Sequence, residues 1–423
     1  MEFKKCFEMA LAASKILIDD YFFKCSNRSK STGFTRERKM GFKDTILFML
    51  NMINKSLQTE LNSFFEKVLN KDTAISKQAF SENRQKIDPK AFIELNDRII
   101  KVIYDECDEY ELWNGYRLTA VDGSIIELPN TEELRDAFGC SKNQRSQVAR
   151  ARVTCIFDVI NKVVIKSKID NVNTSERKVA EELIPEMLKD SHMNELILFD
   201  RGYPCKELIS SLIEKDTHFV MRLTCNFYRH LMDPKKEDQD IIIKYKKKEY
   251  KVRILRFLLD SRTEEILITN VFDEKLNTED FKALYFMRWG IETKYDELKN
   301  RLEIENFSGT TKVAIEQDFY ASIYLSNMIA LARKDSDDII KEENETKELK
   351  YEYKTNTNIF IGSLKDKFIL MLLETSKRKR NRMYKEIMEQ VSNYRIPIRP
   401  NRQNFRPDRM SRAKYTTNRK RSL

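Results

Sequence analysis

The chain has 423 residues, of which 41% are hydrophobic and 34% are charged. This length suggests two to four domains, and the hydrophobic share excludes a disordered or fibrous chain. The three histidines lack metal-ligand spacing and the seven cysteines form no CxxC, so neither a structural zinc site nor a disulfide framework is expected. The apolar run at 9–18 is broken by Lys15 and is a poor signal peptide, and no segment is long enough to span a bilayer. We therefore expect a cytoplasmic protein.

The formal net charge is +10, and the positive charge is concentrated near the C-terminal end. Residues 376–423, the basic tail, contain 16 Lys or Arg against 3 Asp or Glu. Such a segment favours a polyanionic partner. Nucleic acid is favoured over an anionic membrane because the arginines of the tail follow no amphipathic apolar stripe. These arginines are Arg395, Arg399, Arg402, Arg406, Arg409 and Arg412.

Residues 1–110 are predicted to be mainly helical, because apolar side chains recur at helical spacing between positions 42 and 69. Within this region, the stretch 76–81 is followed by Arg84 and Lys86. One interpretation is a helix cap with a solvated face, and the other is a small helical DNA-binding unit. The pattern alone does not separate these two interpretations.

From residue 117 the sequence becomes β-rich and predicts the α/β class. Three successive strands followed by alternating helices and strands imply a mixed sheet with helices on its faces. The predicted elements are strands at 117–121, 148–160 and 162–169, a helix at 175–188 that Pro185 kinks or shortens, a strand at 195–199, a helix at 204–213 and a strand at 218–223.

The segment 224–275 interrupts that alternation and is predicted to be an all-β insertion with a lysine cluster at 246–248. A long helix capped by Thr278 is then predicted to run to about Glu303. The remaining predictions are an apolar helix at 315–331, a charged and solvated linker at 334–350 and a helix near 364–373.

Two aspartates occur where the predicted strands end. Asp122 precedes Gly123 between apolar runs, which is either a hairpin-turn signal or a carboxylate exposed on a central strand. Asp200 follows a buried strand and is either a polar residue that closes the strand or part of a site. The second interpretation has support because ligands of open α/β sheets gather beyond the carboxyl ends of the strands.

The helix predicted from Thr278 aligns four polar residues. At about 100° per residue, Tyr285, Arg288, Glu292 and Lys299 share one stripe roughly 60° wide beside the apolar face. An ordinary amphipathic helix accounts for the apolar face and tolerates a solvated Glu–Lys pair. It does not account for a Tyr, an Arg and an acid that align at the edge of the core.

The spacing Tyr285-x2-Arg288-x3-Glu292-x6-Lys299 resembles the Y-R-E-K signature of DDE-type insertion-sequence transposases, in the IS-four-like group related to the Tn-five and Tn-ten enzymes. The likeness covers residues from about 30 to 335. Further motifs of the same group are Phe34-Thr35-Arg36, Val121-Asp122-Gly123-Ser124, Asp200-Arg201-Gly202-Tyr203 and Asn306-Phe307-Ser308-Gly309.

The resemblance implies an RNase-H-like (retroviral-integrase-like) mixed-sheet catalytic core with an all-β insertion and helical N-terminal and C-terminal regions. It implies that Asp122, Asp200 and Glu292 are the catalytic residues and hold two Mg²⁺ ions, with Mn²⁺ as a substitute. The expected division is a DNA-end-binding domain at 1–110, catalytic segments at 111–223 and 276–335, the insertion at 224–275, and a linker, helix and basic tail at 336–423.

The resemblance also implies DNA contacts by Tyr285, Arg288, Lys299 and Arg201. A flipped base would stack on Phe227, Tyr228 or Trp289, and the alternative for Trp289 is a place in the core. The expected function is Mg-dependent cut-and-paste transposition in the bacterial cytoplasm, associated with the nucleoid. The expected partners are double-stranded DNA ends, target DNA and a second copy of the chain. The alternatives are an inactive DNA-binding derivative and an RNase-H-like nuclease.

Overall fold

The structure is a computed structural model that describes residues 5–399 apart from 52–54, 143–146, 190, 225–226, 228, 260–262 and 347–349. The chain forms two compact units, each built from segments that are distant in the sequence. Unit 1 comprises Met1–Tyr110, Ile126–Ala151 and Leu298–Leu423, and unit 2 comprises Glu111–Ile125 and Arg152–Glu297.

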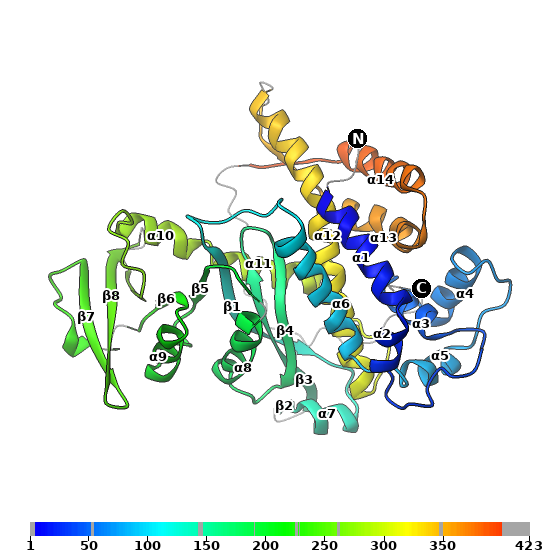
Figure 1. The fold of residues 1–423 in the computed structure, drawn as a ribbon, viewed down its shortest axis with the longest axis horizontal. Helices are drawn as coiled ribbons and strands as arrows, with labels where there is room; N and C mark the ends of the chain where they lie inside the picture. Colours follow the sequence, from blue (N-terminus) through cyan, green and yellow to red (C-terminus); the bar gives the residue numbers. More distant parts are fainter. Residues whose placement is uncertain are drawn as a thin grey trace. The chain divides into compact units, whose positions relative to one another are not determined.

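Within the described residues, nine strands form one mixed sheet in the order β2-β3-β1-β5-β6-β9-β8-β7, with β4 paired to β3. β1, β5 and β6 are parallel neighbours, whereas β6, β9, β8 and β7 pair in antiparallel fashion (Figure 1). The mixed sheet predicted from the sequence is therefore confirmed. The strands are β1 Arg117–Glu127, β2 Cys140–Lys142, β3 Gln147–Asp158, β4 Val163–Asn171, β5 Glu195–Phe199, β6 His218–Arg222, β7 Asp238–Tyr245, β8 Lys248–Leu258 and β9 Glu264–Thr269.

The burial pattern of the strands follows from their places in the sheet. All five residues of β5 are buried, as expected for a parallel strand covered on both faces. β7 alternates exposed and buried residues along its second half, as a strand with one solvated face does. The connecting helices are α8 (Glu176–Lys189) and α9 (Lys206–Glu214). The predicted shortening of α8 at Pro185 is wrong, since the helix continues through it.

The segment predicted as a β-rich insertion contains β7, β8 and β9 and one short 3₁₀ helix, Arg229–Leu231. These strands extend the main sheet, because β9 pairs with β6. The insertion is thus a continuation of the same sheet.

The single helix predicted from Thr278 to Glu303 is wrong. The structure has α10 (Thr278–Phe286) and α11 (Trp289–Asn300), and Asn277 caps the first of them in place of Thr278. At the break, the N–H groups of 287, 288, 290 and 291 each donate to the carbonyl three residues earlier. These tighter 3₁₀-type bonds turn the chain more per residue than an α-helix does, so the two helices do not continue as one regular α-helix.

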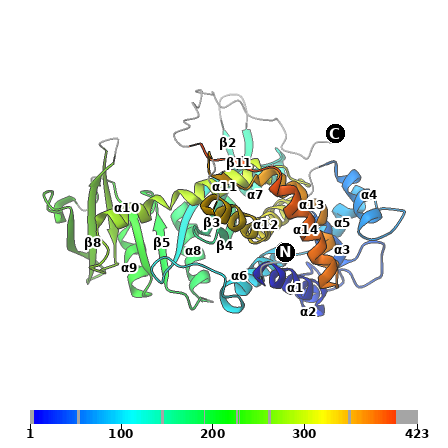
Figure 2. The ribbon, with the colours of Figure 1, turned by 90° about the horizontal axis from the view of Figure 1, so that it is seen from above.

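Unit 1 is mainly helical, as the sequence predicted for its N-terminal part. The Phe48 ring lies 5.3 Å from Phe64 and 4.8 Å from Phe80, between centroids, in edge-to-face contacts. α1 and α6 pack along α12 (Figures 1 and 2). Among the helices described here, none is both long and apolar enough to cross a membrane. The helices are α1 Lys5–Asp19, α2 Tyr21–Ser26, α3 Phe42–Met49, α4 Leu57–Lys67, α5 Lys77–Arg84, α6 Lys90–Lys101, α7 Glu132–Phe138, α12 Lys312–Thr346, α13 Thr357–Leu373 and α14 Lys377–Ser392.

The solvated linker predicted at 334–350 is wrong over most of its length, because α12 continues to Thr346. Tertiary contacts stabilise this charged half of the helix. The buried Tyr384 hydroxyl, on α14, donates to the carboxylate of Asp335. Within α12 itself, Arg333 forms an ion pair with Asp337 at 3.3 Å. Asn344 also exchanges hydrogen bonds with the backbone of Tyr353, both at 2.9 Å. Composition alone could not reveal these partners.

The first part of the basic tail is helix α14, which the sequence analysis did not predict. Its buried residues Tyr384, Ile387, Met388 and Val391 follow helical spacing and pack toward α13. Its exposed cations include Arg378 and Arg382, one turn apart. Arg402, Arg406, Arg409 and Arg412 lie outside the described residues.

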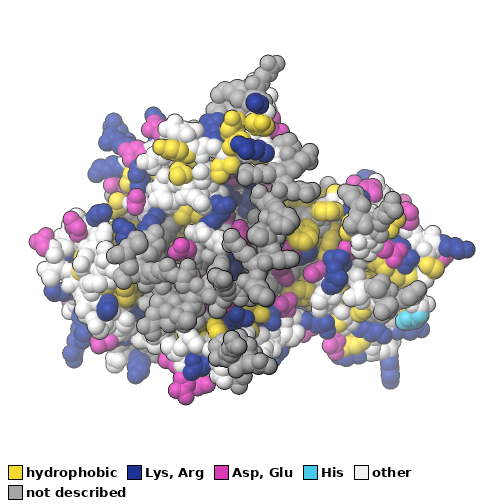
Figure 3. All heavy atoms as spheres, turned by 180° about the vertical axis from the view of Figure 1, so that it is seen from behind, with side chains coloured by type: hydrophobic (Ala, Val, Ile, Leu, Met, Phe, Trp, Pro, Cys, Tyr) yellow, Lys and Arg dark blue, Asp and Glu magenta, His cyan; other side chains and the backbone are white. Residues whose placement is uncertain are grey.

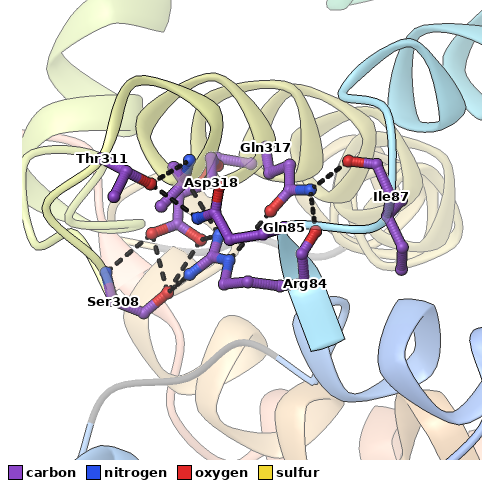
Figure 4. A network of polar contacts seen from close by, with 9 residues as sticks. Arg84, Gln85, Ile87, Ser308, Thr311, Gln317 and Asp318 are labelled. Carbon is purple, nitrogen blue, oxygen red and sulfur yellow. Dashed lines mark hydrogen bonds and ion pairs between the residues drawn. The ribbon is translucent and has the colours of Figure 1, made fainter. Parts of the chain in front are cut away.

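Arg84 occupies a buried polar network that joins α5 to α12 and the turn before it (Figure 4). Its side chain is 1% exposed and forms an ion pair with Asp318 at 2.7 Å. It also donates to Ser308 Oγ at 2.7 Å and to Gln317 Oε1 at 2.9 Å. Gln317 in turn donates to the carbonyls of Arg84 and Ile87. Asp318 therefore balances the charge of the Arg84 guanidinium inside unit 1.

This network removes Arg84 from both interpretations of the stretch at 76–81. Ser76 caps α5 by accepting from the Ala79 N–H at 3.2 Å, as the first interpretation predicted. Arg84 is neither solvated nor available to DNA. The Ser308-Gly309 pair also has a structural reason. Ser308 belongs to the network, and a Cβ at Gly309 would lie 2.5 Å from the Ala314 Cβ.

Candidate active site

Asp122 lies within a continuous strand of unit 2. β1 runs through Asp122 and Gly123 to Glu127, so the hairpin-turn interpretation is wrong. The Gly123 N–H donates to Asp122 Oδ1 at 2.9 Å. A Cβ at Gly123 would lie 2.8 Å from the Glu176 Cγ, so the residue beside Asp122 has to be small. The local sequence thus places a half-buried carboxylate on the strand.

Asp200 lies beside Asp122 in the register of the sheet. β1 and β5 are parallel, with Val121 and Phe199 as paired residues, and each aspartate comes directly after its member of that pair. Neighbouring strands are about 4.8 Å apart. The two carboxylates therefore leave adjacent strands at the same level of the sheet.

The Asp200 carboxylate interacts with two side chains, Tyr285 and Arg222. Tyr285 Oη donates to Asp200 Oδ1 at 3.3 Å, and Arg222 Nη1 lies 4.0 Å from the same oxygen. Arg222 also forms an ion pair with Glu265. Burial raises the pKa of the Tyr285 hydroxyl above its ordinary value, and the nearby Asp200 carboxylate adds to that rise. Tyr285 therefore remains a protonated donor to Asp200.

Glu292 is in the first turn of α11 and interacts with Arg288. Arg288 Nη2 donates to Glu292 Oε1 at 3.0 Å, and the guanidinium lies 5.2 Å from the centroid of the Trp289 ring and 5.6 Å from that of Tyr285. Arg288 is 3% exposed, and its Nε is buried with no hydrogen-bond partner among the residues that the structure describes. A buried cation with an unused N–H suits an anionic ligand.

The electrostatics connect these residues into one cluster. Burial raises the pKa of Asp122 to about 6, and the carboxylates of Glu176 and Glu292 add to the rise. The Gly123 N–H and the Arg288 guanidinium act in the opposite direction. Arg288 also interacts electrostatically with Asp200. It is thus a cation shared by all three predicted acids.

Two residues that interact with Asp122, Tyr295 by a hydrogen bond and Glu176 through its charge, were not found from the sequence. Tyr295 is buried on α11, and its hydroxyl donates to the Asp122 backbone carbonyl at 2.8 Å. Glu176 forms an ion pair with Arg152. Tyr295 is three residues after Glu292, a spacing that marks a neighbour on the helix surface. No sequence signal pointed to Glu176.

The other predicted DNA-contact residues lie in different settings. Arg201 is exposed in the turn after β5, and Lys299 is half-buried in the last turn of α11. Trp289 is 51% exposed, so the alternative that it belongs to the core is wrong. Phe227 is half-buried, whereas Tyr228 lies outside the described residues.

The donor chemistry fits a divalent cation, because carboxylate oxygens are the ligands that Mg²⁺ prefers. The adjacent positions of Asp122 and Asp200 fit a shared ion. Among the described residues, however, no three His, Cys, Asp or Glu side chains are gathered closely enough to hold a metal. In this conformation Glu292 bonds to Arg288.

A family model described as "Transposase DDE domain" matches residues 113–328, just over half of the chain. The chain belongs to this transposase DDE domain family. The matched part of the transposase domain contains Asp122, Asp200 and Glu292.

One solved structure similar to the transposase is described as a piggyBac transposase synaptic complex with hairpin DNA, studied by cryo-EM. The match has a TM-score of 0.43 and 11% identity, and covers 91% of this chain and 84% of that one. Among curated proteins, no relative matched.

Proposed function

We propose that this protein is a DNA transposase that cleaves the ends of a transposon and joins them to target DNA by a cut-and-paste route. The observation that carries the proposal is the register of Asp122 and Asp200 on neighbouring parallel strands, with Glu292 on a helix that faces the same cation. Membership of the transposase DDE domain family supports the reaction class.

An RNase-H-like core is part of the proposal. The resemblance places the first aspartate on the first strand, the second just after the fourth strand, and the glutamate on a helix after a β-rich insertion. Asp122 on β1, Asp200 after β5 and Glu292 on α11 follow that order when the three-residue β2 is set aside. The pairing order β4-β3-β1-β5-β6 supports the same core.

Asp122, Asp200 and Glu292 would hold the metal ions. We propose that Asp122 is shared and that Asp200 and Glu292 each complete one site. When bound, Mg²⁺ would activate the attacking oxygen and stabilise the leaving one. Glu292 would have to exchange its bond with Arg288 for the metal, which frees the Arg288 guanidinium for a DNA phosphate.

The flanking residues would position DNA. Arg288 would contact a phosphate once Glu292 has exchanged its bond for the metal, and the exposure of Arg201 supports a second contact. Tyr285 and Lys299 are proposed to assist, with Tyr285 acting also through Asp200. The exposed Trp289 ring is the better candidate for stacking a flipped base, since it lies beside Arg288.

The N-terminal region at 1–110 is proposed to recognise the transposon ends, and a homodimer to bring two ends together. The exposed cations of α14, with the rest of the basic tail, are proposed to contact the DNA backbone without sequence preference or to contribute to the dimer. On the face shown in Figure 3, Lys and Arg side chains are interspersed with Asp and Glu. Phosphate contacts are therefore expected at local clusters of cations.

The test is cleavage of DNA that carries the inverted repeats flanking the gene, with Mg²⁺ present. The intact chain should cleave it, and Asp122→Asn, Asp200→Asn and Glu292→Gln should bind the ends without cleaving them. Asp296→Asn, an exposed acid on the same helix, is the matched control and should cleave.

Three results would contradict the proposal. Cleavage by all three acid variants would remove the catalytic assignment. End binding without cleavage by the intact chain would indicate an inactive DNA-binding derivative. Cleavage of the RNA strand in an RNA–DNA hybrid, with no cut in the duplex, would indicate an RNase-H-like nuclease.

A further inference from the structure

The hairpin between β7 and β8 turns through two lysines. Tyr245 and Lys248 are the last paired residues of the two strands, so Lys246 and Lys247 form a two-residue loop. Both have positive φ angles, 47° and 65°. A two-residue loop with two positive φ angles is the arrangement of a type I′ turn.

These positions normally take Asn and Gly. Glycine adopts positive φ without a steric penalty, and Asn tolerates it, whereas a lysine Cβ crowds the backbone there. Two successive lysines therefore oppose the local preference of the turn. Residues that break a local rule without a structural gain point to a functional role.

The charges of the hairpin point to the same two residues. Its other lysines have acid partners: Lys244 with Glu249 at 2.8 Å, Lys248 with Glu214 at 2.8 Å and Lys251 with Asp240 at 2.7 Å. Lys246 lies over the Tyr245 ring at 5.0 Å. In the described part of the chain, neither Lys246 nor Lys247 has a carboxylate at ion-pair distance, and both are exposed.

The hairpin is also fixed in place within unit 2. Tyr245 Oη donates to Glu207 at 2.6 Å and Tyr250 Oη donates to Glu214 at 2.7 Å. Both acids are on α9, which begins six residues after Asp200. The tip thus places two cations on a hairpin that is hydrogen-bonded to the helix following a candidate catalytic residue.

We propose that the Lys246–Lys247 tip binds the phosphate backbone of the duplex DNA on which the active site acts. This inference rests on the proposed function. Each ammonium contacts one phosphate, without reading sequence, and helps to hold the DNA in position on unit 2. The contacts would give a role to two cations in a turn that would be more stable without them.

The test uses the full chain with Asp122→Asn, which removes cleavage, and measures binding to duplex DNA at several salt concentrations. Lys246→Asn with Lys247→Gly restores the preferred turn and should leave the melting temperature unchanged or raise it by about 2–4 °C. The slope of log affinity against log salt should become less negative by about 2, with weaker binding.

Two control variants separate charge from turn geometry. Lys246→Arg with Lys247→Arg keeps both charges and should retain the affinity and the salt slope. Lys162→Gly replaces an exposed lysine with a φ of 60° in the β3–β4 turn, and should change the slope less than the double tip variant does.

An unchanged slope and affinity in the Asn-Gly variant would overturn the inference and make the two lysines solvating residues. If that variant has a lower melting temperature, Lys246→Gln with Lys247→Gln decides in its place, by the same slope. Failure of the proposed function would give a different result. The intact chain, with Asp122 present, would then cleave no duplex DNA with Mg²⁺, whichever residues occupy positions 246 and 247.

Discussion

Arg288 donates to Glu292 across 3.0 Å, from a guanidinium that is almost completely buried among the predicted catalytic acids. Its field lowers the pKa of Asp122 while Glu292 and Glu176 raise it. Arg288, which the resemblance implies as a DNA contact, is therefore also the cation that offsets the negative charge of the three acids. This double role makes Arg288 the most informative residue to change.

Arg288→Met should raise the pKa of Asp122 above about 6 and remove a donor from the site. We expect the rate of end cleavage to fall by about 10²–10³, as when one preorganised donor is removed. The acid limb of the pH–rate profile should move to higher pH. Single-turnover cleavage across pH 5–9 measures both effects, and a profile identical to that of the unchanged chain would contradict the balancing role.

Asp122→Asn should stabilise the protein at neutral pH. The pKa of Asp122 is raised from 3.8 to about 6 in the fold, so the folded state binds the proton more tightly than the unfolded chain does. The free energy of unfolding of the intact chain therefore declines as pH rises from about 4 to 6, and it stays lower above that window. Replacing the charged carboxylate should raise the free energy of unfolding by about 1–3 kcal/mol at pH 7, after allowance for partial exposure. Denaturant unfolding at pH 4 and 7 should show the gain at pH 7 alone.

Tyr285→Phe tests whether the tyrosine acts through Asp200. The variant loses a 3.3 Å hydrogen bond to a partly exposed carboxylate, so the free energy of unfolding should fall by about 1 kcal/mol or less. Cleavage should fall several-fold while end binding changes little. If binding falls and the cleavage rate of bound DNA stays the same, Tyr285 is a phosphate contact and not a positioning residue.

Arg84→Met should destabilise unit 1 strongly. It removes the ion pair of Asp318, whose hydrogen bonds from Ser308 remain, and the donor to Gln317 Oε1. Removing one member of a buried ion pair costs about 3–5 kcal/mol. Gln85→Ala is the matched control, because it removes an exposed hydrogen bond to Thr311 from the same cluster and should cost under about 1 kcal/mol. Equal losses in the two variants would contradict the structural account of the network.

The sequence predicted the parts of the fold that depend on local patterns. The strand that carries Asp122 and the strand that precedes Asp200 could be found because short runs typical of strands come before each acid. The sequence could not show that Val121 pairs with Phe199, since register comes from contacts between strands. The roles of Glu292 and its flanking residues stay predictions.

Other features depended on tertiary partners and were missed or misjudged. The charged half of α12 has a linker composition, yet Tyr384 and Asn344 form contacts that keep it helical. The break between α10 and α11 follows from a short run of tighter hydrogen bonds around Arg288. A helical-wheel calculation assumes a regular α-helix and could not predict this break. Arg84 resembled a surface cation because its partners are more than 200 residues away in the sequence.

The central claim is that Asp122 and Asp200 share a divalent cation that Glu292 helps to hold. Mn²⁺ binding to the full chain, followed by electron paramagnetic resonance, measures this directly and needs no DNA cleavage. We expect the intact chain to bind Mn²⁺ and each of Asp122→Asn, Asp200→Asn and Glu292→Gln to bind it more weakly, with Asp122→Asn weakest. Mn²⁺ affinity equal to that of the intact chain in all three variants would contradict the account.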